Sequence, residues 1–399
     1  CIRDRVHLDD AIRGARREDG LFDGYNLLRL SGGGTRAEVE HLSEMLEGQV
    51  AAMSSGLLEA DDVVRLLNAM YDSALYREDV DSFLLYPARR RPSFLDRNRV
   101  PAEQVDANPL LTALLDAGSE EVLVRDVDGA YHFNSDFHNA SDLEAALDRL
   151  SGNGLGQLAE EHRAATLDLF EQVFHHHGFT GRSSTMYAFE GIGSVYWHMV
   201  AKLLVAVQES ILDGMESTPT ETLGELIDLY YRVRDGLGFN KSAVDYGAFP
   251  TDPYSHTPAH AGAQQPGMTG QVKEELLARW AELGLTVAGG SIRFTPLLLN
   301  DRDFGAQAGE LTYLDVNHME KQQVVEPNAA AFTLCQVPVV VHTGEFEPRI
   351  VVTYDDGTER DVSGWSLDEE TSQEIFSRTG RITQLNIFAP RSSVRVLSS

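Results

Sequence analysis

The hydrophobic residues change their spacing along the chain near residue 290. From Thr35 to Gly284 they recur at three and four positions, as in the run from Val39 to Val50. This spacing predicts helices, because it places apolar side chains along one helix face. A Ser-Asp pair that precedes the periodic stretch Leu143–Leu150 is a typical helix start. We therefore expect a mostly helical region up to residue 289.

Short apolar runs of strand length follow residue 290. They are Ile292–Phe294, Leu311–Leu314, Val337–Val341, Ile350–Tyr354 and Ile382–Ile387. An Asp-Asp-Gly turn at 355–357 follows the fourth run, and such turns join antiparallel strands. Helices that all precede the strands are typical of separate domains. The pattern predicts a helical domain over 1–289 and an antiparallel β-sandwich over 290–399.

The composition restricts what the protein binds and where it works. The 399 residues include 33 Lys and Arg against 62 Asp and Glu, so the net charge is −29. This balance argues against a nucleic-acid partner, because phosphate backbones are bound by clustered basic side chains. No apolar run reaches the roughly 20 residues of a membrane span. With Cys1 and Cys335 alone there is no disulfide framework, which indicates the cytoplasm.

Metal-binding patterns are missing from the sequence, so we expect no metal site. No Cys-x-x-Cys or His-Glu-x-x-His motif occurs, and Pro258 between His256 and His260 argues against one helix that presents both histidines. The segment Cys1–Arg5 has neither an initiator Met nor a signal pattern. We expect the chain to be the C-terminal part of a longer protein.

The first segment with candidate chemistry surrounds Asp23. Asp23 is followed by Gly24 and lies between Phe22 and Tyr25. Apolar rings disfavour the charged form of a carboxyl group and raise its pKa, so Asp23 is a candidate general acid near neutral pH. The alternative interpretation is an ordinary Asp-Gly turn between two helices.

The second segment, Gly181–His198, is rich in glycines and aromatic residues. Aromatic faces stack on sugar rings and polar groups bond sugar hydroxyls, so this composition is typical of a sugar-binding wall. The candidates for substrate contact are Arg182, Tyr187 and Trp197, and Glu190 is a second candidate catalytic carboxylate. In the alternative interpretation the segment is a packed helix entry with Trp197 in the core and His198 as a buried histidine.

The third segment places Thr269 and Gly270 at the start of an amphipathic helix over Gln271–Leu283. Unpaired backbone N–H groups and the positive end of the helix dipole favour an anion there. The alternative is that Thr269 only caps the helix. Tyr254 and His256, in the loop before this helix, are further candidates for substrate contact.

Taken in order, the three segments resemble the C-terminal half of the cellobiose phosphorylase group of inverting β-glucoside phosphorylases. In that family an Asp-Gly-x-Asn segment carries the general acid, a Gly-Gly-x-x-x-His segment supplies a phosphate-binding histidine, and a Thr-Gly pair at a helix start completes the phosphate site. The similar residues here are Asp23–Asn26, Gly193–His198 and Thr269–Gly270. Phe22 stands where the family has tryptophan, which points to a longer or differently linked β-glucan.

The resemblance implies a fold, a reaction and partners. The fold is an (α/α)₆ six-hairpin barrel, incomplete at its N-terminal side, followed by the β-domain. Asp23 would protonate the glycosidic oxygen while His198, Thr269 and Gly270 hold the attacking phosphate. The partners are an oligosaccharide and phosphate as co-substrate, with no other cofactor, and the family often forms homodimers.

Two other functions remain open from the residues. An inverting hydrolase on the same barrel would use Glu190 or Asp136 to activate water, since hydrolysis requires a base as well as an acid. A carbohydrate-binding module without catalysis is the alternative from another class. Glu190 is also the rival general acid.

Overall fold

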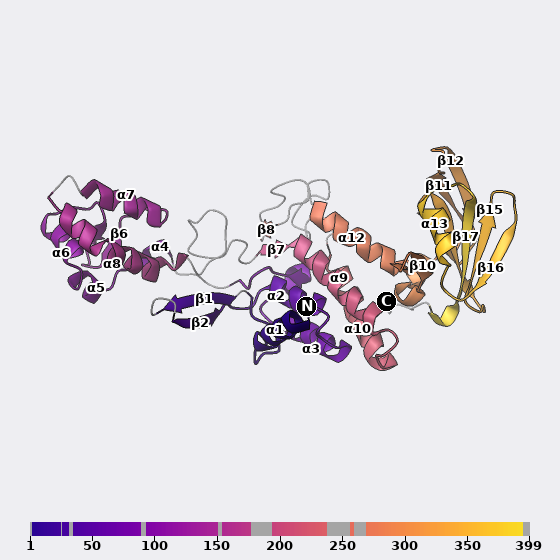
Figure 1. Ribbon diagram of the computed structural model, residues 1–399, viewed down its shortest axis with the longest axis horizontal. Coiled ribbons are helices and arrows are strands. Elements are labelled where there is room, and N and C mark those ends of the chain that lie inside the picture. Colours follow the sequence, from indigo (N-terminus) through magenta and orange to yellow (C-terminus); the bar gives the residue numbers. More distant parts are fainter. Residues whose placement is uncertain are drawn as a thin grey trace. The chain divides into compact units, whose positions relative to one another are not determined.

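The protein is described by a computed structural model over residues 2–24, 26–31, 35–88, 93–150, 154–176, 194–237, 256–258 and 269–393 (Figure 1). The chain forms two compact units, one of 1–200 with 233–267 and the other of 201–232 with 268–399. This grouping places the helices of 201–232 with the C-terminal strands, whereas the sequence predicts a domain boundary between 289 and 290.

A β-hairpin lies near the N-terminus, where the hydrophobic spacing predicts helix. The elements here are α1 Ile2–Gly14, β1 Asn26–Ser31, β2 Arg36–His41, α2 Leu46–Ser54 and α3 Ala60–Tyr71. β1 and β2 pair antiparallel, with Leu28 opposite Val39. The helical prediction is therefore wrong between Thr35 and Leu46, because the apolar residues from Val39 to Val50 belong to a strand, a connection and a helix in turn. Polar and apolar residues alternate over Arg36–His41, which is the period of a strand.

Short elements connect α3 to the next part of the chain. They are β3 Tyr76–Arg77, the 3₁₀ turn Glu78–Val80, and β4 Ser82–Phe83. The rings of Tyr71, Tyr76 and Phe83 lie 4.8–5.7 Å apart between centroids, which anchors this connection on the end of α3.

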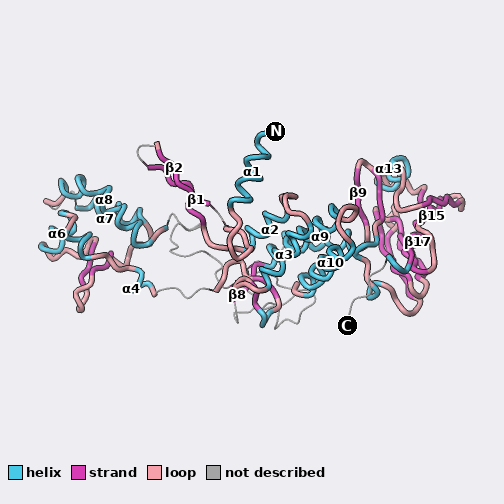
Figure 2. The backbone as a smooth tube through the Cα atoms, turned by 90° about the horizontal axis from the view of Figure 1, so that it is seen from below, coloured by secondary structure: helices cyan, strands magenta, loops and turns pink. Residues whose placement is uncertain are grey.

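The stretch from Phe94 to Phe174 has a hydrophobic core of its own. Its elements are α4 Phe94–Arg97, α5 Ala102–Asp106, α6 Pro109–Asp116, β5 Leu123–Arg125, β6 Tyr131–Phe133, α7 Ala140–Leu150 and α8 Gly156–Phe174. Figures 1 and 2 show α7 and α8 side by side. Phe133 and Phe170 meet edge to face at 5.0 Å, and both are almost fully buried. The helix predicted over Leu143–Leu150 is confirmed as α7.

The next described helices are α9, α10 and α12. The elements are β7 Ser194–Tyr196, α9 Trp197–Gly214, α10 Thr220–Asp235, β8 His256–Pro258 and α12 Thr269–Glu282. The buried Tyr230 hydroxyl of α10 donates to Glu282 of α12 at 2.7 Å, and Gln208 of α9 donates to the carbonyl of Ala278 at 2.8 Å. These bonds pair polar groups in the interior, where an unpaired group is costly. The predicted helix start at Thr269 is confirmed.

The C-terminal sheet has five strands in the order β13-β14-β17-β15-β16. The strands and helix of this part are β9 Leu285–Ala288, β10 Ser291–Phe294, β11 Gly309–Leu314, β12 Glu320–Val325, β13 Ala329–Leu334, β14 Val337–Gly344, β15 Arg349–Tyr354, β16 Glu359–Ser363, α13 Glu369–Phe376 and β17 Ile382–Pro390. Short 3₁₀ turns lie at Pro296–Leu298, Asp301–Asp303 and Arg391–Ser393. All five strands predicted from the apolar runs are confirmed.

One strand pair in this sheet corrects the prediction of antiparallel pairing throughout. β14 pairs parallel with β17, with Val340 opposite Asn386. A parallel pair requires a long crossover connection, and β15, β16 and α13 supply it between β14 and β17. The sheet is therefore mixed. Among the described helices, none has both the length and the apolar character to cross a membrane.

Candidate functional site

Asp23 lies at a point where three segments of the backbone meet. Its N–H donates to the carbonyl of Ala15 at 2.8 Å, and its backbone pairs with that of Glu44 in an antiparallel bridge. The buried amide of Gln49 accepts from the N–H of Phe22 and donates to its carbonyl, both at 2.8 Å. Gln49 thus binds both backbone polar groups of Phe22, the residue before Asp23.

The first turn of α2 approaches the Asp23 backbone as closely as glycine allows. A Cβ added at Gly48 would lie 2.6 Å from the Asp23 carbonyl oxygen. A Cβ at Gly24 would lie 3.0 Å from the Met45 sulfur and the Ser43 carbonyl. Because carbon atoms do not approach oxygen that closely, a larger residue at position 48 must displace either Asp23 or the helix.

The Asp23 carboxylate has a basic side chain at each oxygen. Oδ1 lies 3.5 Å from Nη1 of Arg17, and Oδ2 lies 3.2 Å from Nδ1 of His41 at the end of β2. The Asp23 side chain is 15% exposed, whereas that of His41 is 47% exposed. The carboxyl group therefore keeps a path to solvent while its orientation is set by two neighbours.

Arg17 holds a second, more deeply buried carboxylate. Its Nη1 lies 2.9 Å from Oε2 of Glu44, whose side chain is 10% exposed. Arg17 also donates to both oxygens of Asp19, with Nη2 to Oδ2 at 2.9 Å. The hydrogen bonds that Arg17 donates to Asp19, together with the charges of Glu44 and Asp23, raise the pKa of Arg17 above its ordinary value. One guanidinium group thus faces three carboxylates.

The segment that enters α9 packs on the residue after Glu44. Tyr196 lies against a buried cluster of Met45, Leu85 and Tyr86. Val195 pairs with Leu84 in an antiparallel bridge. Burial and the nearby charge of Glu47 raise the pKa of Tyr196. The Asp23–Glu44 region and the start of α9 are therefore joined through Met45.

His198 and Trp197 differ in exposure at the start of α9. The His198 ring is half-buried and lies edge to face with Tyr196 at 5.8 Å between centroids. Trp197 is 1% exposed, which is the core position of the alternative interpretation. His198 is thus partly exposed as a residue, although its Nε2 atom is buried, whereas Trp197 lies in the core.

The other predicted site residues fall at or beyond the limits of the described part of the chain. Arg182, Tyr187, Glu190 and Tyr254 lie outside the described residues. For His256 in β8, and for Thr269 and Gly270 at the start of α12, the backbone alone is described. Asp136, the second candidate base, is exposed after β6.

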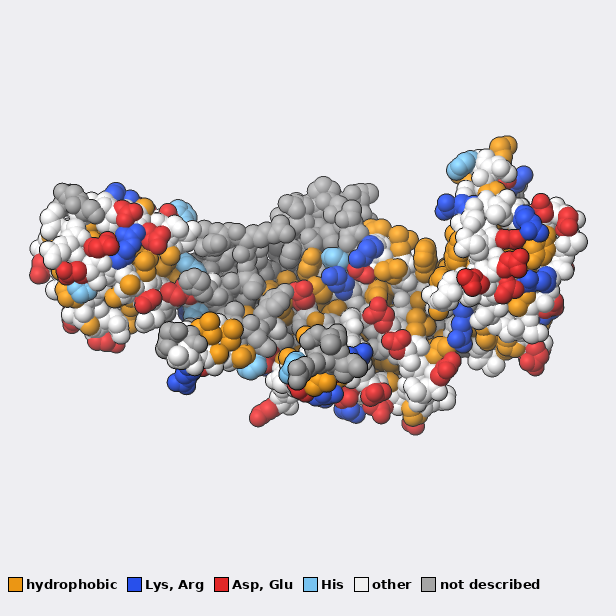
Figure 3. Space-filling model, in the orientation of Figure 1, with side chains coloured by type: hydrophobic (Ala, Val, Ile, Leu, Met, Phe, Trp, Pro, Cys, Tyr) orange, Lys and Arg blue, Asp and Glu red, His pale blue; other side chains and the backbone are white. Residues whose placement is uncertain are grey.

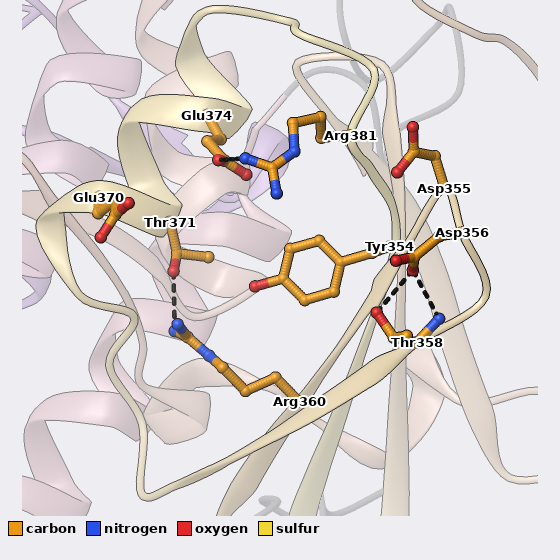
Figure 4. A pocket seen from close by; sticks show the side chains of 9 residues that line it. All are labelled: Tyr354, Asp355, Asp356, Thr358, Arg360, Glu370, Thr371, Glu374 and Arg381. Carbon is orange, nitrogen blue, oxygen red and sulfur yellow. Dashed lines mark hydrogen bonds and ion pairs between the residues drawn. The ribbon is translucent and has the colours of Figure 1, made fainter.

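A polar pocket of about 220 Å³ lies in the C-terminal part, between the β15–β16 turn and α13 (Figure 4). It is lined by Tyr354, Asp355, Asp356, Thr358, Arg360, Glu370, Thr371, Glu374 and Arg381. Arg360 is paired with Asp368 at 2.8 Å and Arg381 with Glu374 at 2.6 Å. Carboxylates outnumber guanidinium groups in this lining, so it does not favour an anion. Figure 3 shows acidic and basic side chains interspersed over the same part of the chain.

The described residues also contain no group of three or more His, Cys, Asp or Glu side chains arranged to hold a metal ion. The expectation of no metal remains a prediction for the chain as a whole.

Comparison with known proteins finds a similarity in one part of the chain. Residues 91–177 match a family model described as GH149 phosphorylase insertion domain 2. This match supports a glycoside phosphorylase. The matched residues take in all of the separate core between Phe94 and Phe174. A search of curated proteins found no match to the chain.

Sequence reasoning singled out Asp23 and did not find its partners. Arg17, His41 and Glu44 lie in separate segments, and no motif links them. The signal in the sequence is weak: an Arg-Arg-Glu-Asp run at 16–19 that reads as a solvated charge cluster. The β1–β2 hairpin returns the chain from Asn26 to His41, and this return places His41 beside Asp23.

Proposed function

We propose that the protein is an inverting glycoside phosphorylase that cleaves a β-linked gluco-oligosaccharide with inorganic phosphate and releases a sugar 1-phosphate. The observation that carries the proposal is the match of 91–177 to a phosphorylase insertion domain. The resemblance of the Asp23, His198 and Thr269 segments to the cellobiose phosphorylase group supports it independently, because these segments lie outside the matched residues.

The reaction requires a single carboxylate that acts as an acid. Phosphate is already an anionic nucleophile, so no base is needed to activate water. In the proposed step a phosphate oxygen bonds to the anomeric carbon from the face opposite the leaving group. The glycosidic C–O bond breaks, and Asp23 transfers its proton to the departing oxygen. The β configuration is thereby inverted to an α-linked sugar phosphate.

The geometry around Asp23 supports its role as the acid. Its backbone is held by Ala15 and by the close approach of Gly48, and its carboxyl group is partly exposed. A catalytic group must be held in place while it reaches the substrate. Glu190 is the rival acid in this proposal.

The proposed phosphate site consists of His198, Thr269 and Gly270. His198 is half-buried at the start of α9, and α12 begins at Thr269, where backbone N–H groups lack partners within the helix. In a chain of net charge −29 such a site must be locally positive to attract phosphate. Arg182, Tyr187, Tyr254 and His256 are the proposed sugar contacts.

The remaining expectations belong to the same proposal. The helical part would be the C-terminal portion of an (α/α)₆ barrel, the C-terminal strands a β-sandwich, and the assembly a homodimer in the cytoplasm. The barrel and the homodimer are implied by the resemblance to the cellobiose phosphorylase group, the β-sandwich by the strand-length apolar runs, and the cytoplasm by the two cysteines.

The test uses the complete protein and a panel of β-linked gluco-oligosaccharides, each with and without phosphate. The expected product is a sugar 1-phosphate that forms only with phosphate present. Free sugar released at a rate indifferent to phosphate would indicate the hydrolase instead. Binding of oligosaccharide with no turnover under either condition would indicate the carbohydrate-binding module.

A further inference from the structure

Glu44, which is buried, and Arg17, which is partly exposed, form an ion pair that touches Asp23 but lies outside the three segments used in the proposed function. Their N–O distance is 2.9 Å, against 3.5 Å from the same Arg17 nitrogen to Asp23. Glu44 is also the less exposed of the two carboxylates. Ion-pair strength rises as distance and exposure fall, so Arg17 is bound more strongly to Glu44 than to Asp23.

An arginine beside a general acid works against the acid, and the ion pair of Arg17 with Glu44 reduces this effect. A guanidinium group near a carboxylate favours the charged form, and a charged carboxylate has no proton to donate. When a second carboxylate already compensates the arginine, the guanidinium group stabilises the charged form of the first much less. Two carboxylates beside one cation also repel each other when both are ionised, which favours a proton on one of them.

We propose that Glu44 is a positioning residue that, together with Asp19, takes up the charge of Arg17, so that Arg17 opposes a proton on Asp23 less than it would alone, while Arg17 holds Glu44 and Asp23 in place. This inference rests on the proposed function for its catalytic meaning. The charged and titratable groups that face Asp23 and its arginine are Arg17 and Asp19 from the loop after α1, His41 from the end of β2, and Glu44 from the segment before α2.

The local backbone fits this role for Glu44. Glu44 pairs with Asp23 across an antiparallel bridge, so its distance from the acid is fixed by the backbone. The next residue, Met45, is 2% exposed and packs with Leu85 and Tyr86. A buried carboxylate held in this way cannot move to solvent without disturbing that cluster.

The test compares two variants that change the charge beside Asp23 in opposite directions. In Glu44→Gln, Arg17 keeps only Asp19 and Asp23 as anionic partners, so more of its charge acts on Asp23 and the alkaline limb of the kcat/KM profile moves to lower pH by about one pH unit. In Arg17→Gln, Asp23 is left beside an uncompensated Glu44, so the alkaline limb moves to higher pH. Arg17→Lys keeps the charge and leaves the limb close to that of the unmodified protein.

Asp62→Asn is the matched control. Asp62 pairs with the neighbouring arginine, Arg16, at 3.1 Å and has no contact with Asp23, so its loss leaves the limb in place. If Glu44 had only a structural role, Glu44→Gln and Arg17→Gln would both lower activity at every pH and would leave the alkaline limb of the kcat/KM profile where it is in the unmodified protein. That result, or a shift of both variants in the same direction, would overturn the proposal.

A second measurement separates this inference from the proposed function. The protonation of Asp23 is followed by NMR in protein labelled with ¹³C at the aspartate carboxyl groups, with Asp23→Asn to assign the signal. The titration midpoint is expected to fall in Glu44→Gln and to rise in Arg17→Gln, whether or not the enzyme turns over. Unmoved midpoints overturn the positioning role. Moved midpoints together with full activity in Asp23→Asn overturn the proposed function and leave the positioning role standing.

Discussion

Gln49 binds both backbone polar groups of Phe22, the residue that precedes Asp23. The two hydrogen bonds are each 2.8 Å long, and the same amide also donates to the Met45 carbonyl at 2.9 Å. Gln49 is fully buried in α2. One side chain thus ties the candidate acid to the helix that follows Glu44.

Replacement of Gln49 by alanine is expected to destabilise the protein and to lower turnover. The change leaves the buried N–H and C=O of Phe22 without partners, at a cost of about 1–3 kcal/mol for each unsatisfied group. Urea unfolding measures the free energy, and kcat on an oligosaccharide with phosphate measures the effect on Asp23. Gln157→Ala is the control, because Gln157 is exposed and bonds only Glu161. Equal stability of the two variants would contradict the anchoring role.

Gly48→Ala is expected to lower activity although alanine favours helix. The added Cβ would lie 2.6 Å from the Asp23 carbonyl oxygen, so either the backbone at Asp23 or α2 must shift, and both change how α2 holds Asp23. A displacement of this kind lowers kcat more than it changes KM, because it moves the acid and not the bound sugar. Gly224→Ala in α10 is the matched control: no atom lies within 4 Å of its Cβ, and it should stabilise by about 1 kcal/mol. Normal kcat in Gly48→Ala would show that Asp23 tolerates the shift or has no catalytic role.

Most of the helices and strands can be predicted from the sequence, but the strands and side chains that they pair with cannot. Leu143–Leu150 has a clear helix period and Ile350–Tyr354 is a short apolar run of strand length, and both predictions are confirmed. The pattern around Val39 predicts the wrong element because apolar residues of a strand and of a helix follow one another there at helical spacing. The parallel pairing of β14 with β17 depends on contacts between residues far apart in sequence, which local periodicity does not contain.

The same reasoning applies to the candidate site. Asp23 was identified from its neighbours Phe22 and Gly24, which are local features of the sequence. Arg17 and Glu44 reach it because the chain turns back after α1 and again after the hairpin. No spacing rule relates them, so their roles required coordinates.

We expect the β5–β6 hairpin to lose stability as the pH falls, because Asp126 then becomes protonated. Hydrogen bonds from His132 Nε2 at 2.9 Å and from the Ala130 N–H at 2.8 Å hold the pKa of Asp126 below its ordinary value. A lowered pKa stabilises the folded state above the unfolded value of about 4, and this stabilisation disappears as pH falls through the folded value. Hydrogen exchange of the β5–β6 amides should therefore be faster in Asp126→Asn than in the unmodified protein at pH 7, and equal at about pH 2.

The control for this prediction is Asp128→Asn, in the turn of the same hairpin, where Asp128 donates its N–H to Asp126. Its exchange should match that of the unmodified protein at both pH values. A difference between Asp126→Asn and the unmodified protein that persists at pH 2 would show that the effect is one of packing and not of charge.

The separate core of the matched domain predicts a local effect of mutation. Phe170→Ala removes a fully buried ring that contacts Phe133 and Phe174, and such changes cost about 3–5 kcal/mol. Limited proteolysis should cleave first within 94–174, before the C-terminal sheet is cut. Phe346→Ala, at a partly exposed ring of the C-terminal part, should leave the order of cleavage unchanged. Cleavage spread evenly over the chain in Phe170→Ala would contradict an independent core.

The central claim, that Asp23 protonates the leaving oxygen, is tested most directly with two substrates and one variant. Asp23→Asn is assayed in the complete protein with a β-linked gluco-oligosaccharide and with an aryl β-glucoside whose leaving group needs no proton, both with phosphate. The account predicts a loss of about 10²–10⁴-fold on the oligosaccharide and little loss on the aryl glucoside. Equal losses on both substrates, or full activity on the oligosaccharide, would contradict it.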